Sequence, residues 1–370
     1  MTFVLGILGL GILVFFHELG HFIAARISGV KVEAFSVGMG SVILHHSYKG
    51  TDYRLSLIPL GGYCAMKGES DFKKALEENL AAIEASKDSF YGVHPLKRLF
   101  IAFAGPFFNF FLGFIFLSLI AGIGYIYYTA GNKVSMADEI YPELHSAAHE
   151  AGMKTGDTIL SMNGTSVEDF SEIASYVASR PDEDILVSVD RNGTPLEFIV
   201  HTDLDKETGS GKMGIVSDSS SIVQKERKGK NFTGSVKEGF VESIKIITMT
   251  FKSIRILFKG VNVQNAVSGP ARITSMLGDT IQNGFKAGFR AGIVSTLEFL
   301  AIISISLFMT NLLPVPILDG GLILFAFIEW VSGKKLSPKV LYYIQLAGIA
   351  IIAALMAFTL FGDFMYFIKK

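Results

Sequence analysis

The run His17-Glu18-Leu19-Gly20-His21 carries the most specific chemistry in the sequence. Its two histidines are four residues apart, so on a helix they share one face and both imidazoles can bind one Zn²⁺ at about 2.0–2.1 Å. Glu18 is then placed to take a proton from a water bound at the metal. The pattern predicts hydrolytic zinc chemistry. The alternative is a pair of core histidines beside an accidental glutamate.

The surroundings of this motif favour the metal. From Met1 to Ala25, the only ionisable side chains are His17, Glu18 and His21. A charged side chain at membrane depth costs about 2.5–3.5 kcal/mol on insertion scales, so this group of three needs compensation. A metal held by deprotonated ligands supplies that compensation. The stretch also lacks a basic start and a small-residue cleavage site, so we expect a retained span and not a signal peptide.

A catalytic zinc usually takes three protein ligands and keeps a fourth position for water. Two carboxylates at membrane depth are candidates for the third ligand. Glu298 lies mid-helix, whereas Asp319 closes the run Asn311-Leu-Leu-Pro-Val-Pro-Ile-Leu-Asp-Gly-Gly321. Two prolines end the helix there, and small residues let the carboxylate turn inward. We therefore choose Asp319, and expect Glu298 to be a buried hydrogen-bonded carboxyl or else a second functional group.

Asn311 opens the same run. Its amide can donate a hydrogen bond to the oxyanion that forms when water attacks a peptide carbonyl. The alternative is an asparagine that caps or packs a helix.

Composition tells which elements must position these residues. Of 370 residues, 50% are hydrophobic and only 18% are charged, and the mean hydropathy is +0.43. The net charge of −1 excludes a nucleic-acid-binding chain, and the single Cys64 excludes an internal disulfide or a cysteine-based zinc cluster. Four apolar stretches reach the ~20 residues that cross a bilayer. They lie near 3–26, 99–129, 291–312 and 340–363.

Basic residues beside these stretches predict their orientation. They flank the loops 27–98 and 332–339, which we expect in the cytoplasm, with both termini and 133–288 outside. The expected fold is a polytopic α-helical membrane protein of four transmembrane helices, with a membrane-dipping β-hairpin segment and an inserted extracytoplasmic PDZ-like α/β domain.

The PDZ-like interpretation rests on the string from Ala151 to Gly164, on a helix at 170–179, and on strands at 185–189 and 196–200 joined by an Arg-Asn-Gly turn. Such a domain binds C-termini or extended peptides by strand addition; the alternative is a small β domain that spaces the helices. An amphipathic stretch, 236–258, is expected to lie in the membrane interface, or alternatively to pack on this domain.

The expected segments follow in order. They are the first transmembrane helix with the H-E-L-G-H motif, 1–28; a membrane-associated β segment, 29–70; a cytoplasmic helical insert, 71–98; the second transmembrane helix, 99–130; the PDZ-like domain, 131–205; a linker with the amphipathic helix, 206–288; the third transmembrane helix with the Asn311–Gly321 motif, 289–331; a cytoplasmic loop, 332–339; and the fourth transmembrane helix, 340–370. Asp71 to Ser89 is expected to be a charge-rich surface insert.

Taken in order, H-E-L-G-H, Ala104-Gly-Pro-Phe-Phe-Asn109, the PDZ-like insert and N-L-L-P-V-P-I-L-D-G-G resemble the bacterial site-2 proteases, close to the RseP/RasP-like group. The resemblance covers nearly the whole chain and includes Arg54–Gly68 and Ser268–Ile273. It implies an intramembrane zinc metalloprotease of a bacterial cytoplasmic membrane, with the active site near the cytoplasmic side. Its substrates would be transmembrane segments, such as those of anti-sigma factors, or remnant signal peptides.

The resemblance also implies residue roles. His17, His21 and Asp319 would be zinc ligands, Glu18 the acid/base, and Asn311 an aid to substrate or transition-state binding, while Pro106 and Asn109 would lie near the substrate. A helical substrate must unwind before water can attack it, so the β-prone segment 53–66, with Tyr53, Leu55 and Leu57, is expected to offer an edge for an extended substrate. The chain departs from RseP itself in having one PDZ-like domain.

Two other function classes remain at this point. A membrane-anchored zinc peptidase that cuts soluble segments predicts an amphipathic motif helix, whereas this helix is apolar all round. A non-catalytic PDZ scaffold would tolerate loss of Glu18. The expected partners are transmembrane substrates, membrane lipid and a C-terminal peptide at the PDZ-like domain, with no nucleic acid.

Overall fold

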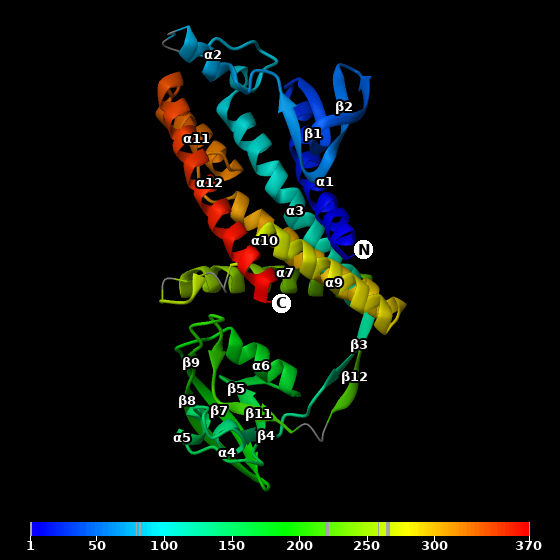
Figure 1. Ribbon diagram of the computed structural model, residues 1–370, viewed down its shortest axis with the longest axis vertical. Coiled ribbons are helices and arrows are strands. Elements are labelled where there is room, and N and C mark those ends of the chain that lie inside the picture. The colour runs from blue at the N-terminus through cyan, green and yellow to red at the C-terminus, as the bar shows by residue number, and fades with distance from the viewer. Residues whose placement is uncertain are drawn as a thin grey trace. The chain divides into compact units, whose positions relative to one another are not determined.

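The computed structural model describes residues 2–78, 80, 83–218, 222–257, 259–263 and 267–369. Figure 1 shows the chain as a ribbon. It divides into two compact units, each described by itself below. The first unit holds Met1–Ile123, Lys230–Ile247 and Gly269–Lys370, and the second holds Gly124–Gly229 and Thr248–Ser268.

Four helices of the first unit are long and apolar enough to cross a membrane, as expected from the four apolar stretches. Their exposed surfaces carry large apolar side chains, for example Leu8 on the first and Leu355 on the fourth. Such surfaces suit lipid tails and not water. The helices are α1 (Thr2–Ser28), α3 (Pro95–Ile123), α10 (Phe289–Asn311) and α12 (Pro338–Lys369).

The second of these helices is shorter than predicted. The apolar run was expected to continue as helix to residue 129 or 130, but α3 ends at Ile123 and the chain continues as strand β3 (Gly124–Thr129). Gly124 has φ 65°, which a glycine adopts at little cost and which ends the helix. β3 pairs antiparallel with β12 (Val223–Lys228) and forms a two-stranded ribbon. Apolar composition alone does not separate these two states.

Two further helices lie in the segment 206–288. The first, α7 (Phe232–Leu257), contains the predicted amphipathic stretch; Phe258 lies outside the described residues. Its small residues Gly239 and Ser243 are buried, whereas Phe240 is exposed. The second, α9 (Pro270–Ala287), was not anticipated as a separate element. Its hydrophobic residues are spaced among polar ones, and the proline at its first turn starts it.

The segment between α1 and α3 forms two long strands, β1 (Val32–Tyr48) and β2 (Thr51–Met66), where several short runs were expected. The strands form an antiparallel hairpin that folds back on itself. Residues 34–37 of β1 are matched with 62–65 of β2 on one side and with 52–55 on the other. Residues 52–55 are also matched with 44–47 across the hairpin turn.

This register corrects the expected edge. Tyr53 and Leu55 lie in a segment that is paired on both sides, so they do not form a free edge. Residues 62–65 are paired with β1 on one side only among the described residues. The segment 53–66 therefore offers an edge at its end and not along its whole length.

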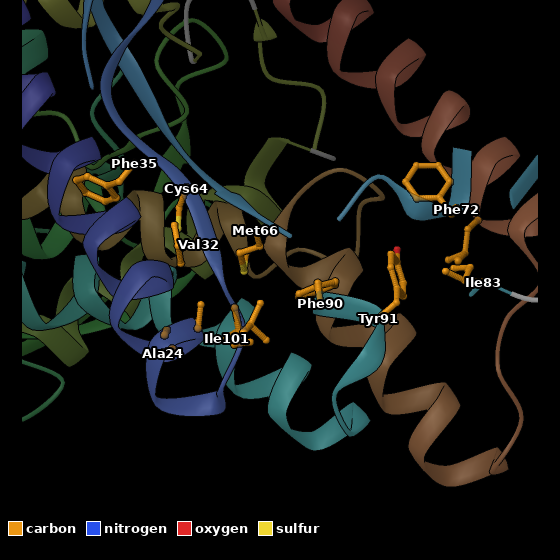
Figure 2. Close-up of a cluster of buried hydrophobic side chains, with 14 of the residues drawn as sticks. Ala24, Val32, Phe35, Cys64, Met66, Phe72, Ile83, Phe90, Tyr91 and Ile101 are labelled. Atoms are coloured by element: carbon orange, nitrogen blue, oxygen red, sulfur yellow. The ribbon is translucent and has the colours of Figure 1, made fainter. Parts of the chain in front are cut away.

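A buried apolar cluster lies beneath this hairpin, as Figure 2 shows. Phe72, Ile83, Phe90 and Tyr91 share it with residues of α1, β1 and β2. The segment Asp71–Ser89 is thus not simply a surface insert, because its described residues Phe72, Ala75 and Ile83 are buried in this cluster. Its described helix, α2 (Asp71–Glu77), is short, and the 3₁₀ turn η1 (Phe90–Gly92) follows before α3.

The second unit contains a sheet in the order β6-β5-β7-β8, covered by the amphipathic helix α6 (Phe170–Ala178). The strands expected at 185–189 and 196–200 lie within β7 (Asp184–Arg191) and β8 (Thr194–His201). Asn192 and Gly193 between them have φ 53° and 84°, the signature of a tight hairpin turn. The core is a cluster of aliphatic and methionine side chains that includes Met136, Ile159 and Val187.

The unit is larger than the expected 131–205 segment, because short strands after residue 203 pair within it. The remaining elements are β4 (Val134–Met136), α4 (Ala137–Ile140), α5 (Ala147–Glu150), β5 (Thr158–Met162), β6 (Thr165–Ser166), β9 (Asp203–Leu204), β10 (Gly211–Lys212) and β11 (Ile215–Ser217).

Candidate metal centre

Three predicted ligand residues meet inside the helical bundle of the first unit. His17 and His21 stand one turn apart on α1, and Asp319 is the first residue of α11 (Asp319–Ser332). Nε2 of His17 is 3.2 Å from Oδ2 of Asp319, and Nε2 of His21 is 3.2 Å from Oδ1. The two Nε2 atoms are also 3.2 Å apart.

These distances test whether the residues fit a zinc ion. Ligand atoms at about 2.0–2.1 Å from zinc, at tetrahedral angles, stand about 3.3 Å from one another. The two Nε2 atoms are 3.2 Å apart and each is 3.2 Å from one oxygen of the Asp319 carboxylate, which is close to this separation. Two imidazoles and a carboxylate are also a donor set that zinc accepts, and three protein ligands leave a fourth position for water. The residues present therefore fit a catalytic zinc.

The outer ring nitrogens of both histidines are held by α3. Nδ1 of His21 is 2.9 Å from the carbonyl oxygen of Ile101, and Nδ1 of His17 is 3.1 Å from the side-chain amide of Asn109. Pro106 lies inside α3 and removes one helical hydrogen bond at this turn. Such outer contacts orient ligating imidazoles. A single helix, α3, therefore contacts both imidazole rings.

A break in the chain between α10 and α11 turns Asp319 inward. α10 ends at Asn311, and the two prolines that follow prevent its continuation. A Cβ on Gly320 would stand 2.2 Å from the carbonyl oxygen of Leu313, so only glycine permits this tight return. The carboxylate thereby reaches the histidines of α1 from a helix start.

Glu18 lies beside residues 62–65 of β2, the segment that is paired on one side only among the described residues. A Cβ on Gly62 would stand 3.2 Å from Cγ of Glu18, so the Glu18 side chain packs against this part of β2. Glu18 therefore neighbours both the ligand pair on α1 and the strand segment with a free side. A carboxylate at this position can exchange a proton with a reactant held there.

The other predicted site residues have different surroundings. Asn311, the last residue of α10, is half-buried, and its side chain makes no hydrogen bond with the described residues. Tyr53 packs against the rings of Phe22 and Phe35. Leu55 and Leu57 of β2 are exposed. The structure thus brings His17, His21 and Asp319 together, with Asn109 behind them, and gives no such contact for Tyr53, Leu55 or Leu57.

Glu298 differs from its leading expectation. Its side chain is on an exposed face of α10 and has no hydrogen-bond partner among the described residues, so it is not a buried hydrogen-bonded carboxyl. The Glu242 carboxylate of α7 interacts with it electrostatically.

Sequence reasoning missed the parts of α3 that contact the rings through backbone. Gly105 lies so close to His21 that a Cβ there would stand 2.2 Å from Nε2. The carbonyl of Ile101 cannot be read from a side-chain pattern at all. The run Ala104-Gly-Pro-Phe-Phe-Asn109 was the available signal, because a glycine next to a proline within an apolar helix marks a special backbone position.

Comparison with known proteins shows to which family the chain belongs. The model of peptidase family M50 matches residues 5–355. A Treponema pallidum protein described as a candidate zinc metalloprotease is 33% identical, over 97% of this chain and 98% of its own. Similarly described proteins of Campylobacter jejuni and Helicobacter pylori strain J99 are 35% and 33% identical, over 98% of this chain and 93% and 98% of their own lengths. The chain belongs to peptidase family M50, the site-2 protease family, and is a metallopeptidase.

Proposed function

We propose that this chain is an intramembrane zinc metalloprotease that hydrolyses peptide bonds within transmembrane segments of other membrane proteins. One observation carries the proposal: two imidazoles and a carboxylate, with neighbouring ligand atoms at separations that suit zinc, lie among helices that are long and apolar enough to span a bilayer. A metal site within the membrane interior can act on peptide bonds that also lie within the membrane.

The residues divide the chemistry among them. His17, His21 and Asp319 would hold the zinc, and the bound ion would supply Lewis-acid polarisation of the scissile carbonyl and activation of water. Glu18 takes a proton from the attacking water and gives it to the leaving nitrogen of the cleaved peptide. Asn311 donates its amide N–H to the oxygen of the attacked carbonyl, where negative charge develops. The apolar helices around the site exclude bulk water and strengthen these interactions.

The substrate pairs as a strand with residues 62–65 of β2. A transmembrane helix hides its carbonyls in its own hydrogen bonds, so cleavage requires an extended conformation with replacement bonds. The segment 62–65 has one side without a strand partner among the described residues and lies next to Glu18. Strand addition there supplies the replacement bonds at the catalytic carboxylate.

The chain acts in a bacterial cytoplasmic membrane, with both termini and the second unit outside and the zinc near the cytoplasmic side. Basic residues flank the loops 27–98 and 332–339, which supports this orientation. The second unit is a single PDZ-like domain that binds a C-terminal peptide or restricts access by size. The proposed substrates are anti-sigma-factor-like proteins and remnant signal peptides.

The test measures zinc content and cleavage of a fluorescent single-span substrate in proteoliposomes. We expect wild type to bind one zinc and cleave, His17→Ala and Asp319→Ala to lose both, and Glu18→Gln to keep zinc and lose cleavage by at least ~10²-fold. Glu298→Gln is the matched control, because it removes a membrane carboxylate outside the site and should leave zinc and cleavage unchanged.

The same assay separates two other functions. Cleavage of the substrate's isolated soluble tail at the same rate as cleavage of the full single-span substrate would indicate a membrane-anchored peptidase that cuts soluble segments. The exposed apolar residues along α1, such as Phe3, Leu8 and Ile12, argue against an active face turned to water. Absence of cleavage by wild type would leave a scaffold role and end the proposal, whereas full cleavage by Glu18→Gln would contradict the role given to Glu18.

A further inference from the structure

Asn109 of α3 has a position that sets it apart from the residues that could touch a substrate. Its side chain is fully buried, and Nδ2 of its amide is 3.1 Å from Nδ1 of His17. Its own backbone carbonyl accepts a hydrogen bond of 2.7 Å from the hydroxyl of Ser304 on α10. The residue is therefore clamped behind the metal centre, on the side of the ring that faces away from Asp319.

His21 provides the comparison. Its Nδ1 contacts the carbonyl oxygen of Ile101, which can only accept a hydrogen bond. Nδ1 of His21 must therefore carry the proton, and Nε2 keeps its lone pair toward Asp319 and the metal position. One ring thus has the tautomer that metal binding requires.

For His17 the partner is an amide, which has one donating and one accepting end. With Nδ2 toward the ring, Nδ1 would have to accept, and the ring proton would move to Nε2, the atom that faces His21 and Asp319. In the same orientation Oδ1 of Asn109 is buried without a hydrogen-bond partner. Both consequences are unfavourable, because a protonated Nε2 cannot bind a metal and a buried unpaired oxygen costs free energy.

A half-turn of the amide removes both problems. The two ends of an amide have nearly the same shape, so the turn needs no additional space. Oδ1 then takes the place of Nδ2 next to Nδ1 of His17 and accepts its N–H. The lone pair of Nε2 is left free on the ligand side of the ring, as in His21.

We propose that Asn109 is a positioning residue for the zinc site: its amide oxygen accepts the Nδ1 proton of His17 and thereby holds the ring in its metal-binding tautomer. The inference rests on the proposed zinc site and assigns Asn109 a role distinct from substrate contact. α3 then supplies one hydrogen-bond acceptor to each histidine, a backbone carbonyl from Ile101 and a side-chain oxygen from Asn109. Loss of such a partner typically weakens metal affinity by about 10–100-fold.

The experiment measures the zinc dissociation constant of the detergent-purified full-length protein by competition with a chromophoric chelator. Asn109→Leu preserves volume without an acceptor, and we expect zinc binding about 10–100-fold weaker than wild type. Asn109→Asp keeps an oxygen that can only accept, so its affinity should stay within about threefold of wild type or rise. Ser304→Ala is the matched control: it removes a hydrogen bond on Asn109 but leaves the amide, and should bind zinc as wild type does.

The outcomes separate this inference from the proposed function. Wild-type affinity in Asn109→Leu would overturn the inference, and so would an Asn109→Asp protein that folds but binds zinc as weakly as Asn109→Leu. Should the aspartate variant not fold, Asn109→Ala with and without added formamide, which has the size of the lost amide group and can accept the proton, replaces it; no recovery counts against the inference. Absence of zinc from wild type itself would instead end the proposed function.

Discussion

Gly105 on α3 faces His21 on α1 so closely that a Cβ at Gly105 would stand 2.2 Å from Nε2 of the imidazole. The next two nearest atoms belong to the same ring. The ligand atom of His21 thus occupies the space that any other residue at 105 would fill. The metal centre depends here on the absence of a side chain.

Gly105→Ala should therefore eliminate zinc binding although every ligand is retained. No real Cβ tolerates such a distance, so the ring must move away from Asp319. We expect zinc content below a tenth of wild type, measured by metal analysis of purified protein. Gly122→Ala, on the same helix, is the control, because its nearest neighbour would be 3.3 Å away. Full zinc content in Gly105→Ala would show that the ring is not held at this place.

A buried ion pair between Arg98 on α3 and Glu329 on α11 predicts a large effect on stability. Both side chains are nearly inaccessible, and Glu329 also accepts the backbone N–H of Leu336. Removing one partner leaves a buried unpaired charge, which typically costs about 3–5 kcal/mol. Arg98→Met should lower the unfolding midpoint in detergent strongly, whereas Arg98→Met with Glu329→Met should recover part of the loss. A double variant as unstable as the single one would contradict this account.

The cap on α9 gives a third prediction. Asp363 of α12 accepts backbone N–H groups from Gly269 and Ala271, at 2.9 Å each, and also from Arg272. Asp363→Ala leaves these groups unpaired, and loss of a cap costs about 0.5–2 kcal/mol. We expect faster hydrogen exchange confined to the first turn of α9, measured by mass spectrometry. Unchanged exchange there would show that the carboxylate does not hold the helix start.

Two histidines of the second unit predict a pH dependence. The Asp203 carboxylate raises the pKa of His145, and the Asp184 carboxylate raises the pKa of His201. A raised pKa contributes stability that is fully present below the unfolded-state value of about 6.5 and is lost as pH rises through the folded-state value. Protection of β7 and β8 from hydrogen exchange, corrected for intrinsic rates, should fall as the pH rises above 6.5.

The control for this prediction is the double variant His145→Gln, His201→Gln, whose protection should not change over the same pH interval. Both side chains are largely exposed, so we expect a modest effect that decreases with added salt. The same slope in the double variant would assign the pH dependence to other groups.

Cross-linking can locate the substrate strand. In a Cys64→Ser, Glu18→Gln background, a cysteine at Ala65 lies on the one-sided segment of β2, and a cysteine at Leu57 lies outside it. A substrate with a single cysteine near the cleavage position should form a disulfide with the first variant at several times the yield of the second. A higher disulfide yield with the cysteine at Leu57 would instead place the substrate beside Leu55 and Leu57, as the sequence alone predicts.

Much of this arrangement can be predicted from the chain itself. The four spans follow from long uncharged stretches, and His17 and His21 share a face because of their spacing. Asp319 could be selected because membrane depth leaves few other carboxylates and prolines interrupt the helix before it. These features follow from local composition and from the helical spacing of residues, both of which can be read directly from the sequence.

What could not be predicted depends on contacts between distant backbones. The end of α3 at Ile123 depends on a glycine conformation and on pairing with β12. The double pairing of residues 52–55 is a matter of register, which an apolar run of strand residues does not specify. The exposure of Glu298 likewise depends on which helices pack beside it, which its position in an apolar run does not specify.

The ligands of the metal centre come from opposite ends of the chain, since α1 supplies the histidines and α11 the aspartate. During synthesis, the first helix enters the bilayer long before the ribosome reaches Asp319. An unfinished chain thus holds two imidazoles without the third ligand and has no competent centre. The complete set of candidate ligands therefore assembles only after α11 has been synthesised and Asp319 has come to lie beside the two histidines.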